Sequence, residues 1–261
     1  MASMSDIAVH RDGATQILRF NRPGKMNALT GAMYDALCDA LEAGEKDTEV
    51  SVHVFRGANG VFTSGNDISD FLASSTGDQA VLKSVLRFIR LVPQIQKPML
   101  AGVDGPAVGI GTTLLFHCDL VFATPSARFH TPFLDLGLVP EAASSLLMPQ
   151  RMGYTRAYEM LVLGKPMDAE AMLRAGLLNA IVPPEELEER VIGAATPLAK
   201  KPPAALALAR RLLRGDAEDV ARRVDEEAAI FARQLQSAEA REAFQAFLEK
   251  RAPDFSKVGD G

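Results

Sequence analysis

Residues 99–123, MLAGVDGPAVGIGTTLLFHCDLVFA, are the most apolar stretch of this chain and decide its fold class. Charged residues, glycines and a proline interrupt the stretch, so it lacks the roughly 20 predominantly apolar residues that a membrane span needs. It divides instead into a buried strand at 99–103, a glycine-rich turn at 105–111, an apolar helix to about residue 118 and a strand at 119–123.

Strands and helices alternate on both sides of this stretch. VSVHVFR at 50–56 alternates cleanly between two faces, which predicts a half-buried strand. Earlier in the chain, Thr30 can cap a helix that begins directly after Thr30. The other predicted elements are strands at 14–20 and 127–130 and a helix at 79–95. This order of elements suits an α/β core.

Beyond residue 202 the sequence becomes rich in Ala, Glu and Arg, and helices are predicted at 204–214, 217–236 and 238–250. We therefore expect two parts, a core at 1–200 and a helical C-terminal subdomain at 201–261. A chain of 261 residues that is 48% hydrophobic can bury a full core.

Composition argues against several classes of function. The net charge of −5 and the pI of about 5.5 imply no general affinity for nucleic acid or anionic membranes. The two cysteines match no metal or redox spacing. The first residues lack the basic and apolar regions of a signal peptide, so a cytoplasmic protein is expected.

Several common catalytic motifs are missing from the sequence. Gly109-Ile110-Gly111 follows a strand and opens a helix as a dinucleotide loop does, but the third glycine of that motif would fall at Leu114. Neither a phosphate-binding Gly-Lys-Ser/Thr loop nor a Gly-x-Ser-x-Gly nucleophile elbow occurs. The four histidines show neither i,i+4 pairing nor a nearby acid cluster at ligand spacing, so no metal is expected.

Two glycine-marked turns, at 64–67 and 108–111, stand where backbone N–H groups can be left free. Such groups suit a carbonyl oxygen that gains negative charge, and glycine lets the backbone approach a ligand closely. Glycine turns between strands and helices are also common in proteins without such a site. The two turns alone therefore do not decide the function.

Three motifs that include these turns occur in order along the chain. They are Asn21-Arg22-Pro23 with Asn27-Ala28-Leu29, Phe62-x-Ser64-Gly65-Asn66-Asp67-Ile68, and Lys97-Pro98 with Gly105-Pro106-Ala107-Val108-Gly109-Ile110-Gly111. From residue 7 to 255 the chain resembles the enoyl-CoA hydratase/isomerase (crotonase) superfamily. The resemblance implies an α/β crotonase (ClpP-like) spiral of ββα units, with a helical C-terminal subdomain that forms a homotrimer or a dimer of trimers. It also implies an acyl-CoA substrate whose thioester carbonyl lies between the N–H groups of Asn66 and Ile110.

The hydratases of this superfamily use two glutamates, and the corresponding positions here are Thr113 and Phe133. Neither side chain can move a proton as a carboxylate does, so ordinary hydratase activity is not expected. The stretch FHTPFLDLGLVPE at 129–141 resembles the 3,2-trans-enoyl-CoA isomerases of the peroxisomal type. That resemblance implies that Glu141 is the lone acid–base residue, which moves a double bond of a fatty acyl-CoA from C3 to C2.

Other roles for the carboxylates of this region are kept as alternatives. Glu141 can also be the N-cap or first-turn glutamate of a helix predicted at 142–151. Asp135 is a second carboxylate nearby, but it matches no catalytic position of the family, and Asp67 is expected to fix its own turn. As an acid–base group Glu141 needs a raised pKa, which apolar neighbours at 133–139 favour if they line a pocket.

The resemblance also implies which residues hold coenzyme A, in the first loop, in the two glycine turns and in C-terminal helices from a neighbouring subunit. These residues are Lys25, Met26, Ser64, Asn66, Asp67, Ile68, Ile110, Phe231, Phe247 and Lys250. The two phenylalanines can equally be core residues and the last lysine a solvated one. Coenzyme A is part of the substrate, so no separate cofactor is expected. The segment at 71–79 is a candidate for shaping the acyl pocket.

Two rival functions stay open at this stage. One is another reaction of the superfamily on an acyl-CoA, hydratase-like, thioesterase or dehalogenase, although Glu141 and the absence of tryptophan argue against dehalogenation. The other is a non-catalytic acyl-CoA-binding protein. In such a protein Glu141→Ala would leave CoA binding intact, and there would be no activity to lose.

Overall fold

The computed structural model describes residues 5–67, 69–70 and 80–257. Six strands form the main sheet in the order β1-β2-β3-β4-β6-β9: β1 (Ile7–Asp12), β2 (Thr15–Phe20), β3 (Val52–Arg56), β4 (Met99–Val103), β6 (Leu120–Ala123) and β9 (Ala180–Ile181). β1 pairs antiparallel with β2, and the other neighbours are parallel. A smaller sheet contains β5 (Pro106–Val108), β7 (Arg128–His130) and β8 (Met167–Asp168).

The chain enters the two sheets in pairs of strands. β4 lies in the main sheet and continues after a short turn as β5 in the small sheet, and β6 continues as β7 in the same way. β4 is parallel to β6 and β5 is parallel to β7, so the pair β6–β7 repeats the arrangement of the pair β4–β5. α4 (Ile110–Thr113) and the 3₁₀ turn η3 (Leu114–His117) join the two turns. The structure therefore confirms the expected ββα repeat.

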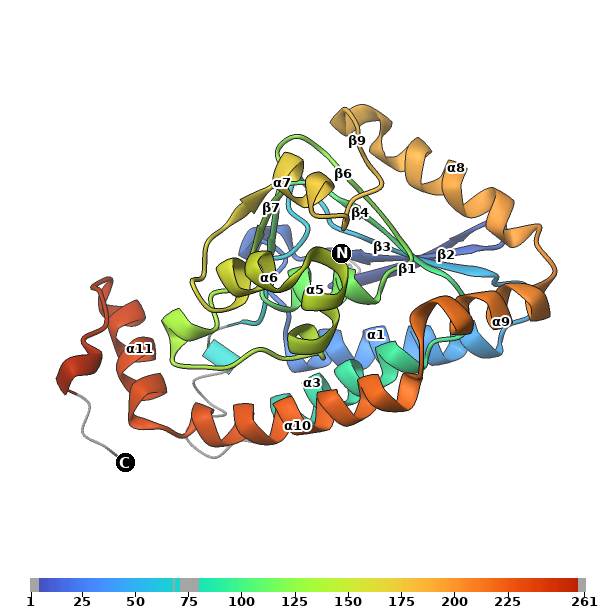
Figure 1. Cartoon of the computed structure of the whole chain (residues 1–261). Helices are drawn as coiled ribbons and strands as arrows, with labels where there is room; N and C mark the ends of the chain where they lie inside the picture. Colours follow the sequence, from blue (N-terminus) through green and yellow to red (C-terminus); the bar gives the residue numbers. More distant parts are fainter. Residues whose placement is uncertain (1–4, 68, 71–79, 258–261) are drawn as a thin grey trace.

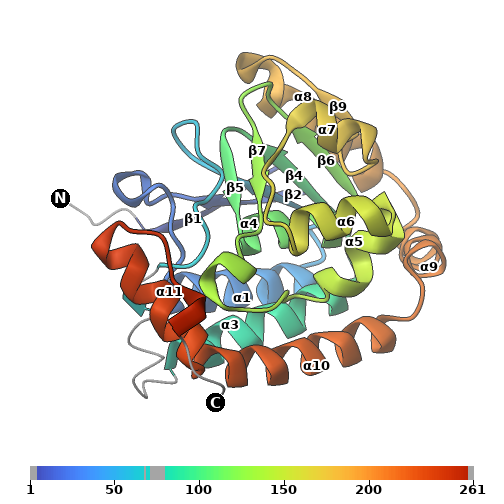
Figure 2. The ribbon, with the colours of Figure 1, turned by 60° about the vertical axis from the view of Figure 1, so that its left-hand side comes forward.

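Helices cover both faces of the main sheet (Figure 1, Figure 2). α1 (Gly31–Lys46) and α3 (Ala80–Leu91) lie on one face, and α10 (Ala217–Leu235) packs on α3. α8 (Leu187–Ala199) contacts β2, β3, β4 and β6 from the other face. Thr30 caps α1, as predicted, by accepting the N–H of Met33 at 3.4 Å.

The prediction that the strand at 50–56 is half-buried was wrong, because β3 is buried on both faces. Val52 and Val54 pack under α8 in a small core with Leu100. On the opposite face the ring of His53 is also buried, since its two nitrogens bond Gln16 Oε1 at 2.8 Å and a carboxylate of α1 at 3.1 Å. The polar alternation therefore marks an internal hydrogen-bond network rather than a solvated face.

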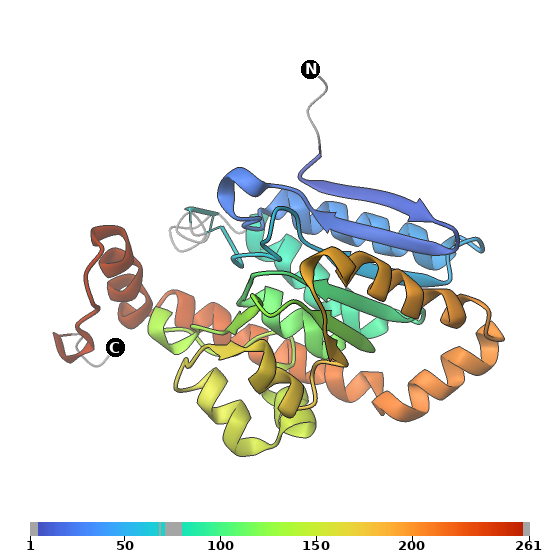
Figure 3. The same ribbon diagram turned by 90° about the horizontal axis from the view of Figure 1, so that it is seen from above.

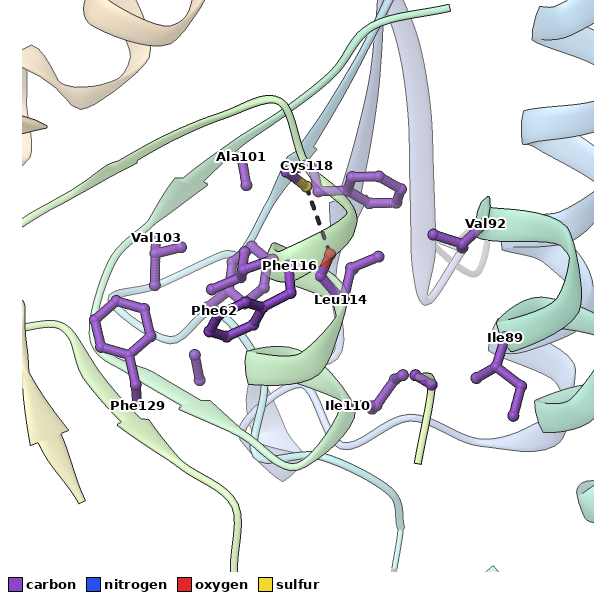
Figure 4. Packing of buried hydrophobic residues seen from close by; sticks show 14 of the residues in the cluster. Phe62, Ile89, Val92, Ala101, Val103, Ile110, Leu114, Phe116, Cys118 and Phe129 are labelled. Carbon is purple, nitrogen blue, oxygen red and sulfur yellow. Dashed lines mark hydrogen bonds between the residues drawn. The ribbon is translucent and has the colours of Figure 1, made fainter. Parts of the chain in front are cut away.

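The larger core lies between the main sheet, the small sheet and α1 with α3. Figure 4 shows part of it, where Val103 of β4, Phe129 of β7 and Phe116 of η3 gather around Phe62. Phe62 also meets Phe20 of β2 edge to face, with ring centroids 5.1 Å apart. This core holds the α4–η3 segment, and with it the glycine turn that precedes α4, in a fixed place.

The C-terminal part is helical, as predicted. It consists of α9 (Pro203–Arg214), α10 and α11 (Ala238–Glu249), and Figure 3 shows α11 at the end of the molecule remote from α9. α11 packs against the 3₁₀ turn η4 (Leu134–Leu136). The predicted boundary near residue 200 falls between α8 and α9, and the division into two domains stays a prediction.

Other differences from the sequence predictions are local. β1 was not predicted, the turn at 105–111 contains β5, and the helix predicted at 79–95 ends at Leu91, where a 3₁₀ turn with Pro93 follows. The other α-helices that the structure describes are α5 (Ser144–Met152), α6 (Tyr154–Leu161) and α7 (Ala169–Arg174). Within the described ranges no helix combines the length and the apolar character needed to cross a membrane.

Candidate active site

A cavity of about 880 Å³ opens between the first loop, the two glycine turns, the segment from β7 to α5 and the C-terminal helices. Its lining includes residues within 22–28, 64–69, 108–110, 130–141 and 231–253. The two turns that the sequence analysis singled out therefore reach one cavity, together with Glu141.

The two glycine turns are held side by side by a short backbone pairing. Thr63 N–H donates to the carbonyl of Pro106 at 3.0 Å, and Val108 N–H donates to Thr63 O at 3.0 Å. Gly65 has φ +86°, and a Cβ built there would lie 2.9 Å from Val108 O. Gly65 is therefore required both by the left-handed backbone and by the close approach of the second turn.

Each turn contributes an N–H group to the site. Among the described residues, no acceptor is recorded for the N–H groups of Asn66 and Ile110, which both line the cavity. The adjacent groups are used in the fold: Asp67 N–H donates at 2.9 Å to a carbonyl just before α1, and Gly109 N–H at 2.8 Å to a carbonyl of β7. Two unused donors that meet in one cavity are the arrangement that stabilises a developing oxyanion.

Side-chain contacts fix the first turn. The hydroxyl of Tyr34, a buried residue of α1, donates a short hydrogen bond to Asn66 Oδ1. Asp67 accepts the Ser69 N–H at 3.0 Å and pairs with Arg22 Nη1 at 2.7 Å. The Ser69 hydroxyl also donates a short hydrogen bond to Asp67 Oδ1, and this bond and the pairing with Arg22 lower the pKa of Asp67. Asp67 thus fixes its own turn, as expected, whereas sequence reasoning missed Tyr34, whose only signal was an amphipathic position on α1.

Glu141 is a buried carboxyl on the wall of this cavity. Thr113 Oγ1 donates a hydrogen bond to Glu141 Oε1 at 2.6 Å. Burial raises the pKa of Glu141 to about 8; the bond from Thr113 opposes this rise and the negative charge of Glu227 adds to it. A carboxyl with such a pKa can exist in both protonation states near neutral pH, which suits a group that takes and returns a proton.

Glu141 does not cap the helix that follows it. α5 begins at Ser144 rather than at residue 142, because Ala142 and Ala143 both have a left-handed φ of +56°. The carboxylate of Glu227, on α10, accepts the N–H groups of Ala143 at 2.6 Å and Ser145 at 2.9 Å. The N-cap alternative is therefore wrong for Glu141, since another carboxylate occupies that place.

The remaining predicted residues divide into two groups. Lys25, Ser64, Phe231 and Phe247 line the cavity, whereas Met26 and Lys250 do not belong to its described lining. The two phenylalanines come from α10 and α11 of the same chain, although the resemblance implied a neighbouring subunit. Ile68 and the segment at 71–79 lie outside the described residues.

A histidine and a further carboxylate also reach the cavity. His130, at the end of β7, and Asp135, an exposed residue of η4, both belong to the lining. Across the described parts of the chain, His, Cys, Asp and Glu side chains form no cluster of three that could hold a metal ion. Of the three carboxylates in the described lining, Glu141 is the buried one.

Comparison with known proteins identifies the family to which this chain belongs. A family model described as "Enoyl-CoA hydratase/isomerase" matches residues 11–258. The chain belongs to the enoyl-CoA hydratase/isomerase family. Its fold is the crotonase fold with C-terminal helices, since the crystal structure of an enoyl-CoA hydratase/isomerase from Pseudoalteromonas atlantica matches it with a TM-score of 0.89 and 38% identity, over 96% of this chain and 100% of that one.

Members of this family that are named for different activities are similar to the chain. Enoyl-CoA delta isomerase 2 of Rattus norvegicus is 39% identical over 225 residues, which is 85% of this chain and 57% of that protein. The 2,3-dehydroadipyl-CoA hydratase of Escherichia coli is 31% identical over 258 residues, 97% of this chain and 99% of that protein. The chain thus matches little more than half the length of the delta isomerase and nearly all of the hydratase.

Proposed function

We propose that this member of the enoyl-CoA hydratase/isomerase family is an enzyme that moves a double bond of a fatty acyl-CoA from C3 to C2. The observation that carries the proposal is Glu141, a buried carboxyl with a pKa raised to about 8, in the cavity lined by Asn66 and Ile110. Thr113 and Phe133 occupy the positions where the hydratases of the superfamily are expected to have glutamates. Of the three carboxylates in the described lining, Glu141 is the buried one, and an isomerisation needs only one proton-transfer group.

The proposed reaction begins when the Glu141 carboxylate takes a proton from C2 of a 3-enoyl thioester. The electron pair of that C–H bond forms a C1–C2 double bond, and the carbonyl pair moves onto the thioester oxygen. This oxygen accepts hydrogen bonds from Asn66 N–H and Ile110 N–H. Glu141, now protonated, returns the proton to C4 while the carbonyl re-forms and the double bond settles between C2 and C3. Atoms and charge balance without a further reactant.

The two parts of the site contribute different amounts to such a reaction. A positioned general base contributes about 10²–10⁴-fold to the rate. Each oxyanion donor contributes about 10²–10³-fold. Phe133, Leu136 and Leu138 also line the cavity and supply an apolar surface for the acyl chain. The same apolar surroundings favour the neutral form of Glu141 between turnovers.

The acyl-CoA would lie with its thioester at the two glycine turns, and Lys25 lines the same cavity from the first loop with a charge that suits a CoA phosphate. Phe231 and Phe247 would border the substrate from α10 and α11. Assembly into a homotrimer or a dimer of trimers, and a cytoplasmic location, stay predictions.

A panel of 3-enoyl-CoA thioesters tests the proposal on the wild type, Glu141→Gln and Asp135→Asn, with formation of the conjugated 2-enoyl thioester followed by absorbance. We expect E141Q to lose about 10²–10⁴-fold in kcat with CoA binding by calorimetry unchanged. Asp135→Asn is the matched control, because it removes an exposed carboxylate from the same cavity. Equal turnover by E141Q and wild type would sink the proposal. Activity only in hydration or thioester hydrolysis assays would assign another reaction of the family.

A further inference from the structure

The turn that follows Glu141 has an unfavourable backbone. Ala142 and Ala143 both adopt φ +56° although neither is glycine, and both are buried. Residues with a Cβ rarely occupy this region, and two in succession persist only where the surroundings determine them. The conformation of this turn decides where the Glu141 side chain points, because the three residues are consecutive.

Two buried polar side chains hold the turn from opposite sides. His117 Nε2 donates to the carbonyl of Ala142 at 2.7 Å. Glu227 accepts the N–H of Ala143 at 2.6 Å with Oε2 and the N–H of Ser145 at 2.9 Å with Oε1. Both side chains are almost fully buried. One therefore occupies a carbonyl and the other an N–H of the same strained pair of residues.

We propose that Glu227 and His117 are positioning residues, which hold the Ala142–Ala143 turn in its left-handed conformation and thereby point the Glu141 carboxyl into the cavity. Neither residue belongs to the described cavity lining, so each acts on a substrate only through Glu141. The inference rests on the proposed function for its consequence in turnover. The contacts that support it are independent of the reaction.

The hydrogen bonds around Glu227 select its ionised form. Each carboxylate oxygen already accepts a backbone N–H, and the Ser145 hydroxyl also donates to Oε1. Arg223 Nη1 donates to Ser145 Oγ at 3.0 Å, which leaves the hydroxyl proton for Glu227. Burial raises the pKa of Glu227, while the bonds from Ser145 and Ala143 oppose the rise.

The charge of Glu227 is also felt at Glu141. The groups that face this pair of carboxyls are Arg223 on α10, Tyr34 on α1 and His117 on η3. Burial lowers the pKa of His117 to about 3, so its ring is neutral and donates through Nε2. Among the described residues, Glu227 therefore supplies the buried negative charge that opposes ionisation of Glu141. Removing it lowers the pKa of Glu141.

Glu227→Gln is the main test, because it keeps the shape of the side chain but places an amide NH₂ against a backbone N–H. We expect kcat for 3-enoyl-CoA isomerisation to fall about 10- to 100-fold through misplacement of Glu141, with KM unchanged. The midpoint of the acid limb of kcat/KM against pH should move to lower pH. A glutamate that only stabilised the fold, without its charge acting on Glu141, would not shift that midpoint.

Two further variants keep the outcome clear. Ser145→Ala removes one donor to Glu227 and leaves the backbone bonds, so we expect a smaller fall in kcat than in E227Q. This variant serves as the test if E227Q fails to fold. Glu218→Gln changes an exposed glutamate on the same helix and should match the wild type in every assay. A folded E227Q with wild-type kcat and pH midpoint would overturn the inference, as would a normal S145A when E227Q does not fold.

A second readout separates this inference from the proposed function. If the wild type does not isomerise any 3-enoyl-CoA, the proposed function fails. The pKa of Glu141 is then read by infrared titration of its carboxyl band, with E141Q as the blank. A lower pKa of Glu141 in E227Q than in the wild type would uphold the coupling. Ser145→Ala should give a smaller decrease, because it removes a hydroxyl bond that lowers the pKa of Glu227 and so leaves Glu227 less ionised. An unchanged pKa of Glu141 in the variants that fold would overturn the coupling.

Discussion

Replacing Glu141 with glutamine should change how the stability of the protein depends on pH. The pKa of Glu141 is raised from 4.5 to about 8, because burial disfavours the carboxylate. Between these values the folded protein holds a proton that the unfolded chain has released, so this group makes the folded state less stable as the pH rises. The penalty is absent well below pH 4.5 and fully developed above pH 8. Glutamine carries no such penalty at any pH.

The size of the effect follows from the same displacement. A rise from 4.5 to about 8 corresponds to roughly 5 kcal/mol when fully developed. Roughly 2–3 kcal/mol of this develops between pH 5 and pH 7, where the unfolded carboxyl is increasingly ionised and the folded one is still mostly protonated. The hydrogen bond from Thr113 to Oε1 survives in the variant, since the glutamine carbonyl accepts it equally well.

Urea unfolding at pH 5, 6 and 7 measures the effect directly. We expect the free energy of unfolding of E141Q, relative to the wild type, to grow steadily over this range. Asp135→Asn removes an exposed carboxylate from the same cavity and should show no comparable growth. A difference between E141Q and wild type that is the same at all three pH values would refute the claim that Glu141 is held protonated by burial.

Two further variants address the parts of the site separately. Gly65→Ala should lower kcat by about 10²–10³-fold, because its Cβ would meet Val108 O at 2.9 Å and displace the oxyanion turn. Gly13→Ala is the control, with the same sign of φ and open space around it, and should spare activity. Equal activity of the two variants would contradict this prediction. Thr113→Val removes a bond that lowers the pKa of Glu141, so the acid limb of kcat/KM should move up by about 1–2 pH units, and a downward shift would be the opposite of what we expect.

The fold was largely predictable because local patterns and tertiary structure agree. The apolar run at 99–123 contains β4, α4, η3 and β6, and the C-terminal helices begin and end within about one or two residues of the prediction. The failures have physical causes. β3 alternates like a surface strand, but His53 is buried under α1 by its hydrogen bonds to Gln16 and Glu45. β1 is an edge strand whose side chains are mostly exposed, so its pattern is weak.

Residues of the candidate site could be predicted only where they lie within a short sequence motif. Glu141 and the glycine turns lie in short recognisable stretches of sequence. Glu227 bonds a residue 84 positions away, and Tyr34 reaches Asn66 across 32 positions, so no local pattern reveals either contact. Thr113 marked a missing hydratase glutamate, and the structure gives it a further role as the donor to Glu141.

Transfer of label within one substrate molecule tests the central claim, that a single carboxyl serves both carbons. A 3-enoyl-CoA deuterated at C2 is converted in a single turnover, and the product is analysed for deuterium at C4. We expect part of the deuterium removed from C2 by Glu141 to appear at C4, and we expect E141Q to give no such product. Two results together would contradict the central claim. The wild-type product would carry only solvent hydrogen at C4 even at the shortest times, and E141Q would form product at the wild-type rate.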